Sequence, residues 1–249
     1  MSRHGRVDQE LLARIETIYG AKRGIYGSPR IYDELDHSGV CCSRKRVARL
    51  MREHHIRAKA ARRFKVTTRR ASDTTVCVDL VKRCFQVERI NQIWTSDITY
   101  LWTAEGWVYL AVILDLYSRR VVGWELSARL SSELVCTALR RALESRPSQG
   151  GLVLHSDRGS QYTSSELQLL AQRYGIRQSY AFSCFDNAVT ESFFHTLKTE
   201  HTWFETYDSR QQVRSSVFDY IEVFYNRQRK HSTLNMKSPV QFEEQHSSP

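Results

Sequence analysis

The spacing of apolar residues divides the chain into two parts with different periods. Up to about residue 56, apolar residues recur at intervals of three and four, as in Leu11, Ile15 and Ile18. This interval is typical of the buried face of an amphipathic helix. The helices predicted from it span residues 7–19, 29–36 and 44–53. The first 56 residues are therefore predicted to form a small all-α domain.

From residue 88 the pattern becomes that of strands alternating with helices. Residues 93–100 alternate between apolar and polar, and residues 107–114 are continuously apolar, as in a buried central strand. The predicted strands are 93–100, 107–114, 121–126, 152–156 and 176–180. Helices are predicted after the third, fourth and fifth strands. Three antiparallel strands followed by this alternation is the order of the ribonuclease H fold, so the predicted class is α/β, with a mixed five-stranded sheet and flanking helices.

This reading gives four segments. They are a helical domain at 1–56, a basic linker at 57–87, an α/β core at 88–207 and a helical extension at 208–249. The extension carries an apolar stripe that is predicted to pack on the core, formed by Val213, Val217, Ile221 and Phe224. Polar residues also stand where helices should begin, and the predicted caps are Ser28, Ser43, Thr163 and Ser209.

The most informative feature of the composition is its charge. The net charge is +10, but residues 44–70 alone hold twelve Lys or Arg and one acid, a net of +11. The rest of the chain is close to neutral. So dense a basic stretch attracts a polyanion, which favours DNA or RNA as a partner over the alternative of a solvated basic linker.

Other features argue against membrane insertion and secretion. The longest apolar run, Trp107–Leu114, is far too short to span a bilayer, and no signal-peptide pattern opens the chain. The six cysteines show neither a C-x-x-C pair nor a metal-ligand spacing. Reduced thiols in a cytoplasmic protein are the expected state.

The third predicted helix has the character of a recognition helix. It follows a short helix and a turn, and its polar face is basic, as in helix-turn-helix domains that place their last helix in the major groove. Its candidate DNA contacts are Arg44, Lys45, Arg49 and Arg52. Arg62 and Arg63 in the linker suggest an arm along the phosphate backbone. A small helical bundle with a polar face is the alternative.

Three carboxylates are the candidate catalytic groups. Asp97 lies in the first predicted strand, Asp157 ends the fourth, and Glu191 lies on the helix after the fifth. In the ribonuclease H order the first and fourth strands are neighbours, so the two aspartates should meet and the helix can bring Glu191 across them. Carboxylates that meet repel one another, and a pair of Mg²⁺ ions, with Mn²⁺ as a possible substitute, is the usual remedy. Asp115 and Asp186 are weaker candidates, expected to cap a hairpin and a helix.

Longer segments resemble the second-frame (OrfB) transposases of bacterial insertion sequences, relatives of retroviral integrases. The likeness covers nearly the whole chain. It is carried by the segments Trp94–Tyr100, Gly106–Ala111, Asp115–Trp124, His155–Ser164, Asp186–Ala188, Glu191–Phe194 and Tyr225–Ser232, and by Tyr26–Ile31 and Val47–Glu53 in the helical domain. At matching positions, Asp97, Asp157 and Glu191 correspond to the family's DDE triad. The spacing between Asp157 and Glu191 is slightly shorter than is usual in the family, within residues 179–185, which should form a flexible loop beside the site.

The resemblance implies a transposase that cleaves and joins DNA by two-metal phosphoryl transfer. Its expected substrates are double-stranded terminal inverted repeats and target DNA. A homo-oligomer on DNA, a first-frame (OrfA) partner or fusion, and a bacterial cytoplasmic, nucleoid-associated location are also implied. Further candidate DNA contacts are His195 and Lys198, which share the helix face of Glu191, and the basic pair Arg229 and Lys230. A catalytically decayed DNA-binding protein and a plain ribonuclease H-fold nuclease remain as alternatives.

Overall fold

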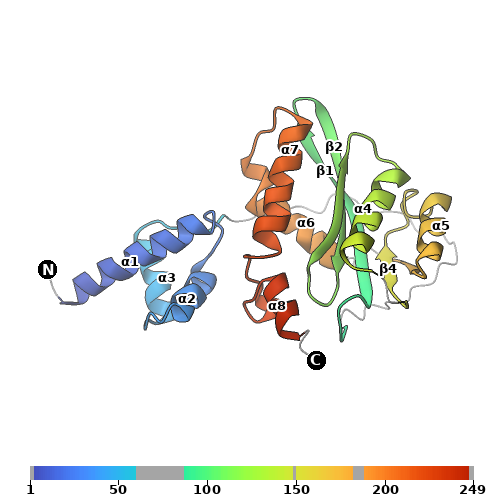
Figure 1. Cartoon of the computed structure of the whole chain (residues 1–249). Helices are drawn as coiled ribbons and strands as arrows, with labels where there is room; N and C mark the ends of the chain where they lie inside the picture. The colour runs from blue at the N-terminus through green and yellow to red at the C-terminus, as the bar shows by residue number, and fades with distance from the viewer. Residues whose placement is uncertain (1–2, 60–86, 148–149, 182–187, 247–249) are drawn as a thin grey trace. The chain divides into compact units, whose positions relative to one another are not determined.

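A computed structural model of the chain describes residues 3–59, 87–147, 150–181 and 188–246. The chain divides into two compact units, residues 1–67 and 68–249, each with its own core (Figure 1). Three of the candidate residues, Arg62, Arg63 and Asp186, lie outside the described residues, as does most of the expected loop at 179–185.

The first unit is a bundle of three helices, as its apolar spacing predicted. They are α1 (Arg3–Ala21), α2 (Ser28–His37) and α3 (Arg44–Glu53). Their apolar faces meet in a core that includes Leu11, Ile15, Ile31, Leu35, Val47 and Leu50. The Ser43 hydroxyl caps α3 by accepting a hydrogen bond from the Arg46 amide at 3.2 Å. The cap predicted at Ser28 is wrong, because Gly27 precedes α2 and Ser28 is already helical.

The second unit is built on the predicted mixed sheet of five strands, in the order β3-β2-β1-β4-β5. The strands are β1 (Ile93–Thr103), β2 (Gly106–Asp115), β3 (Val121–Ser127), β4 (Val153–Ser156) and β5 (Arg177–Tyr180). The first three form an antiparallel meander, and β4 and β5 continue the sheet in parallel from β1. This topology confirms the predicted α/β fold class.

Helices cover both faces of the sheet (Figure 1). The helices α4 (Ser132–Ser145) and α5 (Ser165–Arg173) close one face, over an apolar core that includes Trp94, Ile113 and Leu154. Gly123 lets α4 lie directly against β3, because a Cβ there would stand 2.4 Å from the Ala138 carbonyl oxygen. On the other face lie α6 (Ala188–Glu200) and α7 (Arg210–Phe218).

The C-terminal stretch packs on the core as predicted. Val213, Val217, Ile221 and Phe224 are all fully buried. The stripe starts in α7 and continues through a π-helical segment, Asp219–Tyr225, which the sequence did not predict. After that segment, the Asn226 side chain bonds the backbone of Val121 through both its oxygen and its nitrogen at 3.0 Å, and α8 (Pro239–His246) follows. Short 3-10 turns lie at Thr202–Phe204 and Ser232–Leu234.

Within the described residues, no helix has the length and apolar character that crossing a membrane requires.

Candidate functional site

The pairing of β1 with β4 brings two of the candidate carboxylates to one level of the sheet. The two strands run parallel, with Ile93 opposite Val153 and Thr95 opposite His155. Continued by two residues past the last pair, this register would set Asp97 level with Asp157, and the charge of Asp157 acts on Asp97. The aspartates therefore lie side by side where β4 ends, as the strand order predicted.

The Asp97 carboxyl occupies an unfavourable place for a charge. Its pKa is raised to about 7, mainly by burial and further by the negative charges of Asp157 and Glu191. A hydrogen bond that Asp97 Oδ1 accepts from the Ile98 amide at 2.7 Å and the positive charge of Lys198 act in the opposite direction. Because both carboxylates act on Asp97, the three acidic groups share one electrostatic environment.

The Asp157 carboxylate is held by the chain that follows it. Its Oδ1 accepts a hydrogen bond from the Gly159 amide at 2.9 Å. A Cβ on residue 159 would stand 3.1 Å from the same oxygen, so glycine allows the backbone to approach the carboxylate closely. This turn fixes Asp157 at the end of β4.

Glu191 is brought to the site by the first turn of α6. The preceding residue, Thr190, is fully buried, and its hydroxyl donates to the hydroxyl of Thr95 on β1 at 2.7 Å. Phe193 and Leu197 bury the same helix against the core. The Thr190–Thr95 bond ties the helix to the strand that carries Asp97. Partial burial raises the pKa of the Glu191 carboxyl.

A buried polar layer supports these strand ends. The Tyr162 hydroxyl lies 2.9 Å from the Ser96 hydroxyl, and His155 Nδ1 lies 3.0 Å from the Ser179 hydroxyl. Burial raises the pKa of Tyr162 well above its usual value, and the charges of Asp97 and Asp157 add to that effect. His155 thus has a structural role in this layer.

The two basic residues predicted to share the face of Glu191 have different surroundings. The Lys198 ammonium acts on Asp97 and lies 5.1 Å from the centre of the Tyr100 ring. Burial lowers the pKa of Lys198, and the charge of Asp97 opposes that shift. His195 is exposed and packs edge-to-face on Trp203, with ring centres 6.4 Å apart. Lys198 is therefore the basic residue that belongs to the carboxylate cluster.

The donor set of the site suits a hard divalent cation. All three acidic groups offer oxygen atoms, the ligands that Mg²⁺ prefers. Among the described residues, no three His, Cys, Asp or Glu side chains are arranged to hold a single ion. Mg²⁺, however, is commonly held by one or two carboxylates together with substrate phosphates and water. The residues fit ions that are each shared by two carboxylates.

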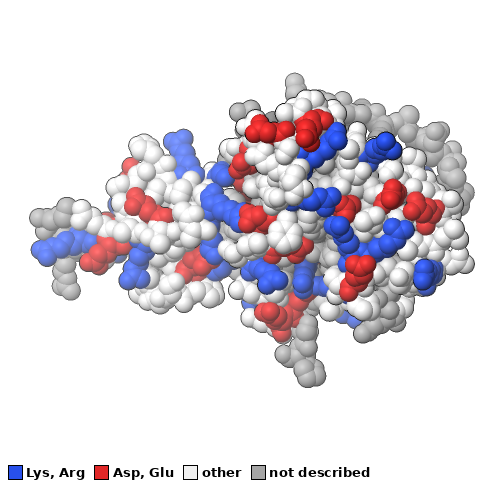
Figure 2. All heavy atoms as spheres, turned by 45° about the horizontal axis from the view of Figure 1, so that its top comes forward, with Lys and Arg blue, Asp and Glu red and all other residues white. Residues whose placement is uncertain are grey.

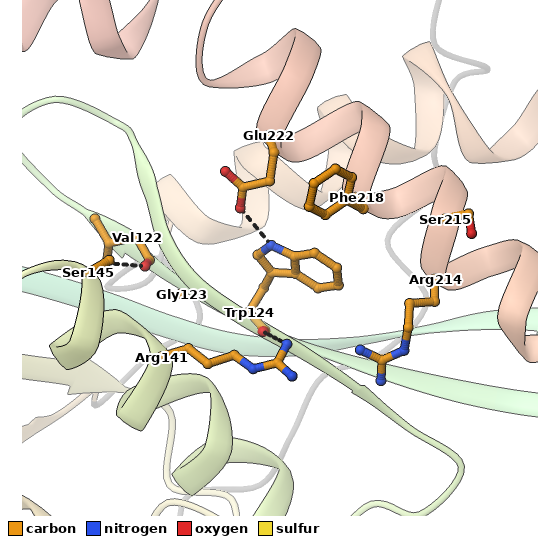
Figure 3. Close-up of a pocket in the computed structure, with 9 residues that line it drawn as sticks. All are labelled: Val122, Gly123, Trp124, Arg141, Ser145, Arg214, Ser215, Phe218 and Glu222. Atoms are coloured by element: carbon orange, nitrogen blue, oxygen red, sulfur yellow. Dashed lines mark hydrogen bonds between the residues drawn. The ribbon is translucent and has the colours of Figure 1, made fainter.

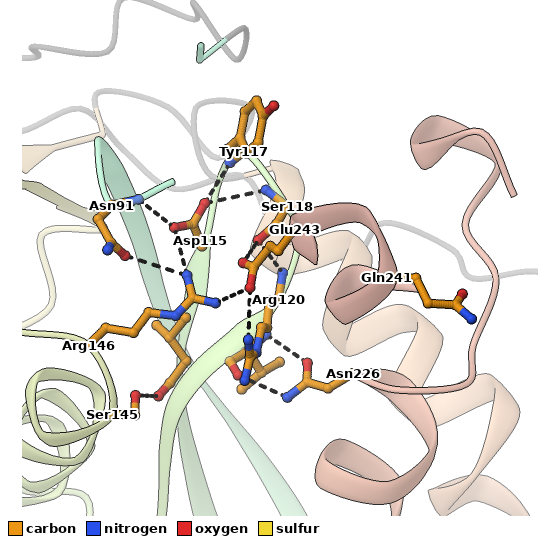
Figure 4. Close-up of polar contacts among 12 residues, drawn as sticks. Asn91, Asp115, Tyr117, Ser118, Arg120, Ser145, Arg146, Asn226, Gln241 and Glu243 are labelled. Carbon is orange, nitrogen blue, oxygen red and sulfur yellow. Dashed lines mark hydrogen bonds and ion pairs between the residues drawn. The ribbon is translucent and has the colours of Figure 1, made fainter. Parts of the chain in front are cut away.

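Asp115, the other strand-end aspartate, has a structural role (Figure 4). Its carboxylate accepts hydrogen bonds from the amides of Asn91 at 2.8 Å and Tyr117 at 2.9 Å, and pairs with Arg146 at 3.3 Å. Arg146 also binds Glu243 of α8, which pairs with Arg120 at 2.8 Å. Asp115 thus caps the turn after β2, as expected, and anchors α8 through a network of ion pairs.

A pocket opens at β3, away from the three carboxylates (Figure 3). Between α4, α7 and the π-helical segment it exposes part of the Trp124 and Phe218 rings, and the Trp124 indole nitrogen donates to Glu222 at 2.9 Å. Its two arginines, Arg141 and Arg214, bind Glu125 at 2.7 and 2.5 Å. The arginines of the pocket are thus engaged with Glu125, and its carboxylate, Glu222, with the Trp124 indole.

The candidate DNA contacts of the first unit differ in availability. Arg44, Lys45 and Arg52 are exposed on α3. Arg49 instead pairs with Asp8 of α1 at 2.7 Å and with Glu53 at 2.8 Å, so its charge is partly neutralised. On the face drawn in Figure 2, basic and acidic side chains are likewise interspersed. The exposed cations of α3 remain the predicted contacts.

Arg229 and Lys230 do not fit the DNA contacts expected of them. The Arg229 guanidinium is buried and makes two bonds of 2.6 Å to the Glu200 carboxylate, which also accepts from the Tyr220 hydroxyl at 3.1 Å. Lys230 is buried as well. The basic pair therefore belongs to the interior that joins α6 to the C-terminal stretch. Its burial was not visible in the sequence, because Glu200 lies 29 residues away.

Comparison with known families agrees with both units. The family described as "Integrase core domain" matches residues 87–182, a second family with that description matches 191–246, and the family "HTH-like domain" matches 6–64.

Two curated proteins illustrate the similarity. The transposase InsF for insertion sequence IS3A of Escherichia coli (strain K12) is 44% identical over 220 residues, which cover 88% of this chain and 76% of that protein. The insertion element IS600 uncharacterized 31 kDa protein of Shigella sonnei is 38% identical over 241 residues, 96% of this chain and 89% of that protein.

One solved structure shares the fold. A chain in the structure of a simian T-cell lymphotropic virus intasome in complex with PP2A regulatory subunit B56 gamma aligns with a TM-score of 0.53 and 15% identity. The alignment covers 94% of this chain and 75% of that chain.

Proposed function

The chain belongs to the IS3-type insertion-sequence transposases, with an integrase core and an HTH-like domain, and we propose that Asp97, Asp157 and Glu191 form its catalytic triad. The triad would cleave DNA at the ends of a mobile element and join those ends to target DNA. The observation that carries this proposal is the parallel pairing of β1 with β4, whose register, continued by two residues, would bring Asp97 level with Asp157. The pKa of about 7 at Asp97, raised in part by the charges of the other two groups, supports it.

Each of two metal ions would be held by two of the three carboxylates. Asp97, which feels the charges of both others, would be shared by two Mg²⁺ ions, with Asp157 completing one pair of ligands and Glu191 the other. When bound, the ions supply Lewis acidity at the scissile phosphate and stabilise the oxygen that leaves. A cation near Asp97 favours its charged form and so reverses the raised pKa. Mn²⁺ has similar ligand preferences and is the expected substitute.

One site can perform both reactions because only the nucleophile differs. In cleavage a water oxygen forms a bond to phosphorus as the bond to the DNA 3′-oxygen breaks. In joining, the freed 3′-hydroxyl attacks a phosphate of the target strand and displaces its 3′-oxygen. The chain's own residues orient the phosphate. Lys198, beside Asp97, would hold a non-bridging oxygen of the DNA end.

The first unit would hold the element's end. Its α3 presents Arg44, Lys45 and Arg52 to solvent, as a recognition helix requires. We expect terminal inverted repeats as the specific DNA and a homo-oligomer that holds two ends. A first-frame partner or fusion could add further DNA contacts. With DNA as substrate, the protein would work at the bacterial nucleoid.

The test is a joining assay with a labelled element end, plasmid DNA and Mg²⁺. Asp97→Asn should abolish joining and leave DNA retention unchanged, whereas the exposed Asp208→Asn should change neither joining nor retention. Joined product from Asp97→Asn would refute the triad. Cutting without joining by the wild-type protein would favour a plain nuclease, and DNA retention without cutting would favour a decayed DNA-binding protein.

A further inference from the structure

Three aromatic side chains form an exposed patch on the hairpin that carries Asp97. Tyr100 and Trp102 on β1 and Trp107 on β2 are 57%, 59% and 47% exposed. Tyr100 and Trp102 both pack edge-to-face on Trp107, with ring centres 5.1 and 4.8 Å away. Scattered exposed apolar residues are ordinary, but three rings in mutual contact are a surface that could bind a partner. We call these three residues the aromatic patch.

The aromatic patch is exposed because the hairpin extends beyond its covering helix. Side chains two residues apart on a strand share a face, so Tyr100 and Trp102 continue the face of Ile98. Ile98 packs against the core closed by α4, whereas the next two positions are left uncovered. Trp102 and Trp107 are directly opposite each other in the β1–β2 register, which brings their rings together.

The β1–β2 hairpin is held in place by hydrogen bonds to Arg210 of α7 and to Tyr207. Its tip is fixed by Arg210 of α7, whose amide donates to the Glu105 carboxylate and whose guanidinium donates to the Glu105 carbonyl, both at 2.9 Å. The Ala104 amide also donates to the Tyr207 carbonyl at 2.9 Å. The rings therefore stand on a fixed support, which lowers the entropy lost when a partner stacks on them.

Lys198 connects the aromatic patch to the carboxylate cluster. The pairing of β1 with β4 stops at Thr95, whereas β1 continues to Thr103. Asp97 and Tyr100 alternate to opposite faces of β1. The Lys198 ammonium, beside this part of the strand, lies 5.1 Å from the Tyr100 ring centre and also acts on Asp97, so it links the two faces. A cation and aromatic faces next to a phosphoryl-transfer site match the two parts of a nucleotide, because phosphate binds the ammonium and a base stacks on the rings.

We propose that the aromatic patch binds unpaired bases of the DNA strand whose phosphate occupies the carboxylate site. The bases must be unpaired, because base faces inside a duplex are already stacked. The strand would run from Lys198 across Tyr100 to the two tryptophans, so the protein would hold a frayed end next to the cut. This inference rests on the proposed function for the identity of the strand, whereas the binding itself needs no catalysis.

The test measures DNA binding by the full chain in EDTA, so that catalysis plays no part. The probes are a labelled single-stranded oligothymidine and a labelled duplex of the same length. Trp102→Ala and Trp107→Ala should each weaken single-strand binding by about 5- to 150-fold, the range expected for one base-stacking contact, and leave duplex binding unchanged. Phe218→Ala is the matched control, because Phe218 is 52% exposed in the pocket at β3.

A conservative variant and a crosslinking measurement complete the test. Trp102→Tyr retains a ring and should bind single strands nearly as the wild type does, which separates stacking from misfolding. Light-induced crosslinking of an oligothymidine that contains iododeoxyuridine should label the hairpin.

Unchanged single-strand affinity in both alanine variants would overturn the proposal, as would equal losses for single strand and duplex. A variant that changes the sedimentation mass but retains single-strand binding would make the aromatic patch a contact between copies. If single-strand binding follows the prediction while Asp97→Asn still joins DNA, only the proposed triad fails.

Discussion

Two clusters of acidic residues lie on the same sheet and are neutralised in opposite ways. At the end of β2, Asp115 and Glu243 face the guanidinium groups of Arg146 and Arg120 (Figure 4). Near the end of β4, Asp97 faces the carboxylates of Asp157 and Glu191 and the ammonium of Lys198. The first cluster carries its counter-charges within the chain. The second has an excess of negative charge.

The pKa directions express this difference at Glu243 and Asp97, whereas burial outweighs the hydrogen bonds and the charge of Arg146 at Asp115 and raises its pKa as well. Burial raises the pKa of Glu243, but its bonds to Arg146 and Ser118 and the charge of Arg146 more than offset that effect, so the pKa is lowered. The pKa of Asp97 is raised to about 7 by burial first and by its acidic neighbours second. A buried carboxylate that lacks its own counter-charge costs stability, and such sites are typical of groups that bind or react. The comparison assigns structure to the first cluster and chemistry to the second.

The largest expected effect is on catalysis, at the cluster with excess charge. Asp157→Asn or Glu191→Gln should each reduce strand transfer by about a thousand-fold or more, because a lost metal ligand forfeits several kcal/mol of transition-state stabilisation. The melting temperature should stay the same or rise, because each change removes a repelling charge. The assay is joining of a labelled end, with the exposed Glu144→Gln as control. Normal joining by either variant would remove that residue from the triad.

The reverse effect is expected at the neutralised cluster. Arg146→Met leaves Asp115 and Glu243 buried without their shared counter-charge, which should cost about 3–5 kcal/mol of unfolding free energy. Urea denaturation measures the loss, and Arg140→Met is the matched control. Arg140 makes a half-exposed pair with Glu166 at 3.6 Å, where about 1 kcal/mol or less is at stake. A loss no greater than that of the control would mean that the network does not anchor α8.

The pH dependence of stability should have opposite signs for Asp97 and Glu243. A raised folded-state pKa means that the folded protein binds the proton more tightly. The stabilisation that this proton gives the folded state is therefore complete below pH 3.8, the ordinary pKa of an aspartate. It is lost as the pH rises toward about 7. For Asp97 the loss in metal-free protein is up to about 4 kcal/mol. Glu243 has the opposite sign, since its lowered pKa stabilises the fold above 4.5 and the benefit is lost in acid.

Denaturation in EDTA between pH 4 and pH 8 tests this prediction. Asp97→Asn should flatten the decline between pH 4 and 7, and Asp208→Asn should leave it unchanged. Added Mg²⁺ should restore stability at the upper end of the range, because the metal requires ionised ligands. A wild-type curve that rises steadily through pH 7 would contradict the raised pKa of Asp97.

Strand order allowed much of the site to be predicted from sequence. The first and fourth strands are neighbours, as expected, and the charge of Asp157 acts on Asp97, as the strand order led us to expect. Helix spacing likewise put Lys198 on the face of Glu191. Both predictions rest on local periodicity and simple topology.

The sequence did not allow us to predict ion pairs between distant residues, or which of two adjacent residues caps a helix. Arg229 follows a helix as an exposed cation would, and only the fold brings it to Glu200. The cap of α5 was predicted at Thr163, but Ser164 occupies that place and accepts from the Leu167 amide at 3.3 Å. Two adjacent hydroxyl residues offer the same chemistry, so the sequence does not choose between them. At Ser43 and Ser209 the predicted residue does cap its helix.

The smallest expected effect concerns the bond that joins the site to the sheet. Thr190→Val leaves the buried Thr95 hydroxyl without its bond to α6, a loss of about 1–3 kcal/mol. The double variant Thr95→Val with Thr190→Val replaces both partners by groups of similar shape and should regain most of that stability. Strand transfer should fall in both variants, because in each the bond that orients Glu191 is gone. Thr196→Val on the same helix is the control. If the double variant regained normal strand transfer together with its stability, packing alone would position Glu191, and the hydrogen bond would matter only to the fold.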